Sequence, residues 1–191
     1  MFKLFLLFFF FVGCEASKVD VEGMYEGDST APIEDIVEFE NCGYSTGMHS
    51  CNFTFLNEEN EEVSLYDFYE STIVLDFSTM WCYWCQQAAY DIPDTVELFK
   101  DHDIVYITLL VENWTGQTPS QLDLKEWVDQ FELNSPVLAS PKEKIIDTSE
   151  VNGFGVAAWP TFIFINKEMI ISSSISGYSK EMINMSITDA L

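Results

Sequence analysis

Residues 41–191 are predicted to form an α/β sandwich with a central mixed β-sheet flanked by helices. The chain has 191 residues, of which 48% are hydrophobic and 15% aromatic, and this is enough apolar material for a buried core. Apolar segments of strand length alternate with segments of helical length, and the last two strands follow one another around a short turn. Alternating elements of this kind build layered α/β domains, and a final hairpin makes the sheet mixed.

The first elements of the domain are predicted from turn and capping residues. Segments 52–56 and 61–64 flank a polar turn and indicate a β-hairpin. Ser64 is placed to cap a short helix that ends at Phe68, and Asp67 completes the capping box. Runs of apolar and β-branched residues predict the remaining strands at 72–77, 104–111, 137–139, 161–165 and 169–174.

Helices are predicted between these strands. Segment 82–100 is long enough for a helix that is kinked or broken at Pro93, because proline lacks the backbone N–H. Ser120 begins a helix that ends at Phe131, with Asp123 completing a capping box. Two further helices are expected at 140–151, where the pattern is weaker, and at 179–190.

The charge of the chain is strongly acidic. There are 32 Asp and Glu against 8 basic residues, all of them Lys, for a formal net charge of −24. Nucleic-acid binding depends on Lys and Arg that neutralise phosphates, so this composition argues against a nucleic-acid partner. The absence of Arg also excludes chemistry that needs a guanidinium group.

Residues 1–13 are predicted to be a signal peptide. Lys3 precedes an apolar run of nine residues, 4–12, which is much shorter than the about 20 residues of a membrane-spanning helix. Phe11–Val12–Gly13–Cys14 resembles the lipobox of bacterial lipoproteins, which implies lipidation of Cys14 and a lipid-anchored protein on the periplasmic side of the bacterial cell envelope. Ordinary signal cleavage is the alternative. Residues 14–40 are acidic without apolar periodicity and are expected to form a flexible tether.

Cys82–Tyr83–Trp84–Cys85 places two thiols at the predicted start of a helix, directly after an apolar strand. The unpaired N–H groups and the dipole of a helix N-terminus stabilise a thiolate, which favours Cys82 as a nucleophile. Cys85, one turn later, can attack a mixed disulfide at Cys82 and release the product. The sequence therefore predicts a redox-active pair, with no cofactor.

Two other interpretations of this pair are open. An inert structural disulfide is one of them. The other is half of a zinc site completed by Cys42, His49 and Cys51, but the spacing does not fit paired zinc-binding knuckles and the start of a helix is a poor position for one. No metal is expected.

Segment 74–85, Val-Leu-Asp-Phe-Ser-Thr-Met-Trp-Cys-Tyr-Trp-Cys, resembles the active-site segment of thioredoxin-like proteins, a strand followed by W-C-x-x-C and a helix. Segment 155–165 resembles the second signature of that family, a cis-proline before an apolar strand. The signatures lie 75 residues apart, from Cys85 to Pro160. The resemblance covers the chain from about Cys51 onward and, with the hairpin and the export signal, points to the membrane-anchored TlpA/ResA-type (redoxin) branch. It implies a thioredoxin-like three-layer sandwich and thiol–disulfide oxidoreductase activity.

The resemblance also implies roles for individual residues. Cys82 is the attacking thiol, Cys85 is the resolving thiol, and Pro160 is the cis-proline whose preceding backbone pairs with a bound substrate chain. Asp76 matches a buried acid below the dithiol that would have a raised pKa and take the proton from Cys85. The alternative for Asp76 is a solvent-exposed acid at a strand end. Trp81 matches the tryptophan of the family, a role compatible with simple packing over the site.

Three positions depart from the family pattern. Tyr83–Trp84 replaces the frequent Gly-Pro pair between the cysteines, which affects the redox potential. Thr108 falls where thioredoxins place a lysine near the buried acid. Trp159 is larger than the usual Thr or Ile, so it either narrows the substrate groove or fills core volume.

Cys42 and Cys51 lie nine residues apart before the predicted hairpin. In an oxidising compartment they are expected to form a structural disulfide. The alternative is a second redox pair that exchanges with Cys82 and Cys85. His49, between them, is expected to be a solvated loop residue.

The sequence features are compatible with three classes of function to different degrees. The favoured class is a thiol–disulfide oxidoreductase that exchanges disulfides with partner proteins, preferably as a reductase, and that is recharged by an unidentified redox partner. The second is a peroxiredoxin-type thiol peroxidase, because Thr79-x-x-Cys82 matches part of its motif, but Leu75 replaces the expected proline and there is no Arg. The third is a non-catalytic binding module, which the presence of both cysteines, Trp81 and Pro160 argues against.

Overall fold

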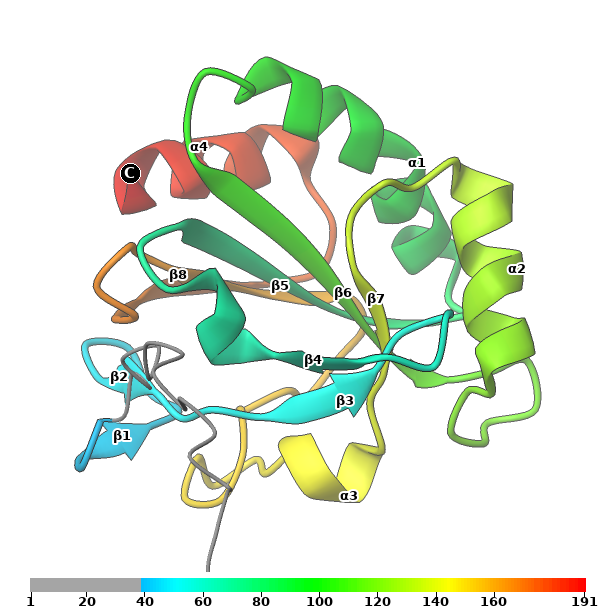
Figure 1. The fold of residues 1–191 in the computed structure, drawn as a ribbon, viewed down its shortest axis with the longest axis horizontal. Helices are drawn as coiled ribbons and strands as arrows, with labels where there is room; N and C mark the ends of the chain where they lie inside the picture. Colours follow the sequence, from blue (N-terminus) through cyan, green and yellow to red (C-terminus); the bar gives the residue numbers. More distant parts are fainter. Residues whose placement is uncertain (1–38) are drawn as a thin grey trace, which may run out of the picture. The chain divides into compact units, whose positions relative to one another are not determined.

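The computed structural model describes residues 39–191 (Figure 1). The predicted signal peptide 1–13, the predicted lipidation site Cys14 and nearly all of the predicted tether 14–40 lie outside the described residues. Within 39–191, no helix combines the length and the apolar character needed to cross a membrane.

A seven-stranded mixed sheet forms the centre of the domain. The strands lie in the order β4–β3–β7–β6–β5–β8–β9. Strands β5, β6 and β7 are parallel, whereas β8 is antiparallel to β5, and the hairpins β3–β4 and β8–β9 close the two edges. The bounds are β3 Thr54–Leu56, β4 Glu62–Ser64, β5 Thr72–Thr79, β6 Ile104–Glu112, β7 Val137–Ala139, β8 Thr161–Ile165 and β9 Ile171–Ser176.

Helical segments cover both faces of the sheet. Successive residues of β5 point to opposite faces, so Val74 packs in one core cluster and Leu75 in the other. The first cluster lies under α1 (Tyr83–Leu98), α2 (Gln121–Phe131) and α4 (Lys180–Ala190). The second lies under η1 (Leu65–Phe68), α3 (Lys142–Ile145) and the loop that carries Phe154 and Val156. This arrangement is the predicted mixed sheet flanked by helices.

Helix α1 is attached to the sheet through one apolar face. Cys85, Ala88, Ala89 and Ile92 occupy helical positions i, i+3, i+4 and i+7, and all four are buried in the same core cluster as Phe162 of β8. The helix was predicted to be kinked or broken at Pro93; it is not broken there, because α1 continues to Leu98. Pro93 lies on the exposed side, so the buried face holds the helix together despite the missing backbone donor.

Two other predicted elements are shorter than expected. Helix α3 ends at Ile145 instead of reaching residue 151. The carboxylate of Asp147 accepts hydrogen bonds from the backbone N–H groups of Ser149 at 2.9 Å and Asn152 at 3.1 Å, and this local turn competes with the helix. Strand β9 starts at Ile171 instead of residue 169, because Met169 adopts a positive φ of 61° in the preceding turn.

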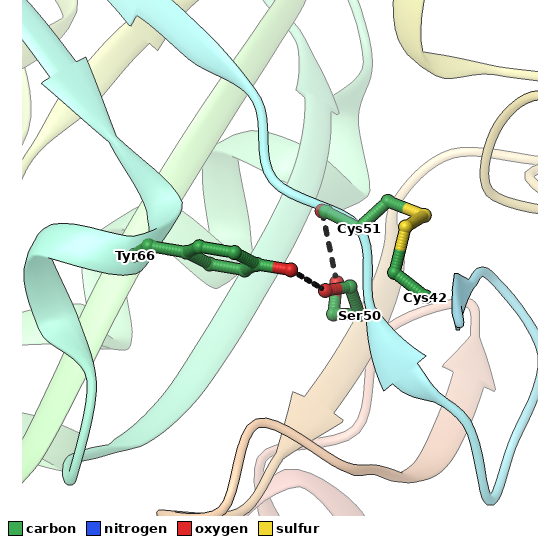
Figure 2. Close-up of a disulfide and its surroundings, with 4 residues drawn as sticks. All are labelled: Cys42, Ser50, Cys51 and Tyr66. Atoms are coloured by element: carbon green, nitrogen blue, oxygen red, sulfur yellow. Dashed lines mark hydrogen bonds between the residues drawn. A yellow bond between two sulfur atoms is a disulfide. The ribbon is translucent and has the colours of Figure 1, made fainter. Parts of the chain in front are cut away.

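A short two-stranded unit that was not predicted precedes the main sheet. Strands β1 (Cys42–Gly43) and β2 (His49–Ser50) are parallel, and a disulfide joins Cys42 to Cys51 with a Cα–Cα distance of 4.7 Å (Figure 2). The hydroxyl of Tyr66 in η1 donates to the Ser50 carbonyl at 2.8 Å, beside the disulfide (Figure 2). The Ser50 N–H donates to the Met169 carbonyl at 2.8 Å. The disulfide therefore closes a loop that is docked on η1 and on the start of β9.

Replacing both Cys42 and Cys51 by Ser is expected to lower the free energy of unfolding by about 2.5 kcal/mol, because the disulfide restricts a short loop in the unfolded chain. The measurement is urea denaturation of wild type and double variant, followed by tryptophan fluorescence. An unchanged transition midpoint would contradict this expectation. If the double variant keeps the thiol exchange activity proposed below, the role of the disulfide is structural; loss of that activity in a folded variant would indicate a second redox pair.

Candidate active site

Cys82 is the N-cap residue of α1, in the turn that follows β5. Its backbone is extended (φ −82°, ψ 117°), and its Sγ accepts a hydrogen bond from the Cys85 N–H at 3.3 Å. The sulfur therefore occupies the place of the oxygen in an ordinary N-cap, where unpaired N–H groups stabilise negative charge. Cys82 is 8% exposed and Cys85 is fully buried, and both are free thiols. Of the two sulfurs, Cys82 is the one that a partner can reach.

Cys85 lies one turn further along α1, inside the core cluster. Burial among apolar side chains raises the pKa of its thiol well above the ordinary range, and a hydrogen bond to Cys82 and the nearby charge of Asp76 raise it further. Cys85 therefore keeps its proton while Cys82 is unreacted. A proton acceptor is needed before Cys85 can act as a nucleophile.

Asp76 is fully buried on the face of β5 that α1 covers, not at a solvent-exposed strand end. In the sheet it is paired with Thr108 of β6 on one side and with Phe162 of β8 on the other. Burial raises the pKa of Asp76 to about 7, although a 2.6 Å hydrogen bond donated by the Ser78 hydroxyl opposes the shift. A carboxyl group with this pKa changes its protonation near neutral pH and is suited to proton transfer.

Asp76 has one side-chain hydrogen-bond partner among residues 39–191, the neutral hydroxyl of Ser78. Its Oδ2 atom has no hydrogen-bond partner among residues 39–191, and the same is true of the buried hydroxyls of Thr79 and Thr108. Thr108 thus occupies the position beside the acid where the family resemblance places a lysine. Ser78 was missed by sequence reasoning, although its position two residues after Asp76 places it on the same face of β5.

The segment before β8 is fixed by hydrogen bonds on both sides of Pro160. The Trp159–Pro160 peptide bond is cis. The Pro160 carbonyl accepts from the Gly177 N–H at 2.8 Å, and the Thr161 hydroxyl donates to the Ala158 carbonyl at 2.8 Å. Gly177 has a φ of +86°, a conformation that favours glycine. Within 39–191 the backbone N–H and carbonyl of Trp159 make no hydrogen bond.

Aromatic side chains surround the dithiol. Trp81, Tyr83 and Trp84 are all exposed, and Trp81 is 48% exposed. Tyr83 contacts Trp84 edge to face with ring centroids 5.1 Å apart, and Trp84 stacks on Tyr178 at 6.3 Å. The Nε1 atom of Trp81 donates to Glu112 Oε2 at 2.9 Å. Exposed aromatic groups of this size are typical of surfaces that contact another protein.

The ligand set considered for zinc is not available. Cys42 and Cys51 form a disulfide with each other, and Cys82 and Cys85 are free thiols. His49 is half-buried: its Nδ1 makes a 3.0 Å hydrogen bond with the Glu168 carbonyl and its ring stacks on Phe39 at 4.1 Å. The prediction that His49 is a solvated loop residue is therefore wrong.

Comparison with known proteins identifies the family. The model of the AhpC/TSA family matches residues 46–174, which is more than half of the chain. The chain belongs to the AhpC/TSA family. The matched residues of this chain include the dithiol, Asp76 and Pro160. The curated thiol–disulfide oxidoreductase ResA of Bacillus thuringiensis (strain Al Hakam) is 24% identical over 138 residues, which cover 72% of this chain and 73% of ResA.

Solved structures share the fold. The Chlorobium tepidum protein assigned as the thiol:disulfide interchange protein DsbE superimposes with a TM-score of 0.64 at 19% identity, covering 77% of this chain and 98% of that one. A secreted disulfide oxidoreductase of Mycobacterium tuberculosis superimposes with a TM-score of 0.56 at 14% identity, covering 72% and 95%. These matches confirm the predicted thioredoxin-like fold. The resemblance to ResA-type proteins, which are named thiol–disulfide oxidoreductases, is confirmed as well.

Replacing Asp76 by Asn is expected to stabilise the protein increasingly as the pH rises. Below an unfolded-state pKa of 3.8 the carboxyl group is protonated in both states, and between 3.8 and the folded value of about 7 its burial becomes steadily more costly. The gain in the free energy of unfolding should grow from about 1.5 kcal/mol near pH 5 to about 4 kcal/mol near pH 8. Urea denaturation at several pH values measures it.

Asp147→Asn is the control for this experiment, with the opposite sign. Hydrogen bonds from Ser149 and from the Asn152 backbone lower the pKa of Asp147, which lies in a surface turn, to about 2. Its stabilising contribution to the free energy of unfolding is fully present above pH 3.8, the unfolded-state pKa, and is lost as the pH falls through about 2. Asp147→Asn should therefore be destabilising near neutral pH. A gain from Asp76→Asn that does not change with pH would contradict the assignment of Asp76.

Proposed function

We propose that this protein is a thiol–disulfide oxidoreductase that exchanges disulfides with partner proteins through Cys82 and Cys85. One observation carries the proposal: the sulfur of Cys82 caps α1 and accepts the Cys85 N–H, while the second thiol is buried behind it within the influence of Asp76. An accessible nucleophile, a protected resolving thiol and a nearby acid are the parts that two-step disulfide exchange needs.

Reduction of a partner proceeds in two steps. The Cys82 thiolate attacks one sulfur of the partner disulfide; the partner S–S bond breaks, a mixed disulfide with Cys82 forms, and the other partner sulfur leaves as a thiolate that takes a proton. Cys85 then transfers its proton to Asp76 and attacks the Cys82 sulfur. This releases the second partner thiolate and leaves a Cys82–Cys85 disulfide, so the partner gains the two electrons that the dithiol loses. A thiol-donating redox partner restores the dithiol.

The proton transfer to Asp76 is supported by the chemistry of its surroundings. Its pKa of about 7 allows a substantial fraction to be ionised at neutral pH, and Oδ2 is free to receive a proton. Removal of the Cys85 proton is otherwise unfavourable, because burial holds the pKa of that thiol high. Thr108 stands beside Asp76 where thioredoxins place a lysine, and among residues 39–191 no ion pair holds Asp76 in the ionised state.

The proposal takes the reducing direction, as the TlpA/ResA-type resemblance of the dithiol and cis-proline segments implies. The exposed aromatic surface formed by Trp81, Tyr83 and Trp84 and the free backbone groups of Trp159 suit a protein substrate, since an extended partner segment can pair with the backbone while its side chains contact the rings. Trp159 is half-buried: it packs against both core clusters, and the Nζ atom of Lys142 lies 5.8 Å from its ring centroid, so its exposed part is the part proposed to contact the partner segment.

Purified wild-type protein is expected to reduce disulfides of a protein substrate, and Cys82→Ser should abolish the activity, because no other thiol replaces the nucleophile. Cys85→Ala should accumulate mixed disulfides with partners, detected on non-reducing gels and identified by mass spectrometry. Tyr90→Phe, an exposed change on the same helix, is the control with retained activity. Equal activity of wild type and Cys82→Ser would refute the proposal.

The same preparations separate disulfide exchange from peroxidase chemistry. The chain contains no Arg to activate a peroxide, and the buried strand residue Leu75 stands where the peroxiredoxin motif has proline. Peroxide consumption by wild type that exceeds its disulfide reduction would favour a thiol peroxidase. Inactivity in both assays would favour a non-catalytic binding module.

We further propose that the protein is exported and tethered to a membrane of the bacterial cell envelope by a lipid at Cys14, on the periplasmic side. The apolar run 4–12 and the lipobox-like Phe11–Val12–Gly13–Cys14 support this. A disulfide at Cys42–Cys51 suits an oxidising compartment, and one structural relative is a secreted protein. The acidic segment 14–40 would then span the space between membrane and domain.

Expression of the full chain in a bacterium tests the anchor. Wild type is expected in the membrane fraction, and Cys14→Ser in the soluble periplasmic fraction or retained as uncleaved precursor. Ser17→Ala, three residues after the lipobox, is the matched control and should fractionate as wild type. Mass spectrometry of the mature N-terminal peptide detects the mass of a lipid attached to Cys14. A wild-type N-terminus without lipid would mean ordinary signal cleavage.

A further inference from the structure

Glu112 contacts the segment that carries Cys82 and also the first residue of α3. It has no role in the steps of disulfide exchange. It is the last residue of β6, and its carbonyl accepts the Met80 N–H at 2.9 Å. Its side chain is only 18% exposed. The sheet therefore fixes the backbone of Glu112, and the site restricts where its carboxylate can lie.

The carboxylate of Glu112 joins two different parts of the site. Trp81, the residue before Cys82, donates its Nε1–H to Oε2 at 2.9 Å. Lys142, the first residue of α3, donates to Oε1 at 3.3 Å. The Nζ atom of Lys142 also lies 5.8 Å from the ring centroid of Trp159, within the range of a cation–π interaction. A continuous series of contacts thus links Trp81 to Trp159 through Glu112 and Lys142.

The two tryptophans at the ends of this series belong to the two segments of the site. Trp81 directly precedes Cys82, and Trp159 directly precedes the cis-proline and packs against the core cluster that contains Cys82. Trp81 is half-exposed, and a surface indole without a hydrogen bond is free to change rotamer. Holding both rings in place before binding lowers the ordering cost of association.

We propose that Glu112 and Lys142 form a bridging pair of positioning residues that hold Trp81 and Trp159 as the two walls of the groove for the partner chain. The inference rests on the proposed function, and it names the residues that set recognition of a polypeptide disulfide. Loss of the bridging pair weakens binding of the partner chain more than it slows the sulfur chemistry, because neither residue is bonded to a thiol.

The chain contains a matched control for Glu112. Glu126 accepts a hydrogen bond from the Nε1–H of Trp114 at 3.3 Å, and Trp114 is 47% exposed, so this pair repeats the Glu–Trp contact on the surface. Within the described part of the chain, no hydrogen bond or ion pair connects that pair to Trp81, Trp159 or Lys142. Glu126→Ala therefore removes a similar interaction away from the bridging pair.

The test compares KM and kcat for two substrates: a short peptide closed by one disulfide, and bis(2-hydroxyethyl) disulfide, which has no peptide backbone and no side chains. Glu112→Ala should raise KM for the peptide about tenfold, as expected for one lost hydrogen bond to a charged group. Its kcat with the small disulfide should fall by less than this factor. Glu112→Gln keeps an oxygen for the indole N–H and should recover most of the loss, Lys142→Met should lie between the two, and Glu126→Ala should match wild type.

A spectroscopic readout accompanies the kinetics. The indole N–H signal of Trp81, assigned with Trp81→Phe in 15N-labelled protein, should exchange faster with solvent in Glu112→Ala and stay protected in Glu112→Gln. The inference is overturned if Glu112→Ala leaves KM for the peptide at the wild-type value, or if both substrates lose activity equally. If wild type reduces neither substrate, the proposed function fails and the inference fails with it, which the wild-type measurement alone reveals.

Discussion

The packing of one face of α1 against the core cluster on one side of the sheet is the constraint on which the site depends. Cys85, Ala88, Ala89 and Ile92 form a continuous buried stripe, and small residues in its middle allow the helix to approach the sheet closely. This packing directs the helix N-terminus to the end of β5. It also closes the core over Asp76 and so creates both the protected thiol and the raised pKa of the acid. A single apolar contact surface thus determines the nucleophile, the resolving thiol and the proton acceptor.

Electrostatics in this protein act locally against an unfavourable overall charge. The net charge of −24 opposes a further anion, and no Arg is present to compensate it. At the start of α1 the Cys85 N–H donates a hydrogen bond to the Cys82 sulfur at 3.3 Å, and a helix N-terminus favours an anion at this place. Around Asp76 the partner is a neutral hydroxyl from Ser78 instead of a cation. The site therefore depends on backbone dipoles and burial, and very little on paired charges.

The sequence was sufficient for the sheet, the capped helices and the position of the dithiol, because these depend on local patterns. Capping boxes at Ser64 and Ser120 and the alternation of strands are short-range signals, and both boxes are present in the structure. The end of α3 was not predictable in the same way, since the Asp147 turn and the helix compete within a few residues.

The contacts of Glu112 and Ser50 were missed for a different reason. Glu112 meets Trp81 and Lys142 across 31 and 30 residues of sequence, and Ser50 meets Tyr66 across 16, so only the folded chain brings these partners together. Asp76 was predictable in part. Its residue type and its position suggested an acid near the dithiol, but its burial depends on how closely α1 packs against the sheet.

The loop closed by Cys42–Cys51 also protects an exposed sheet edge. β9 is the last strand on its side of the sheet, and the backbone groups of Ile171 that point away from β8 are occupied by Gly47 and Met48 at 2.8 and 2.9 Å. An unpaired edge strand is a template for intermolecular strand addition and aggregation. The loop covers the beginning of β9 and leaves Ser172–Ser176 as the remainder of this edge strand; four of these five residues are serine, so the remaining edge offers few apolar side chains to an added strand.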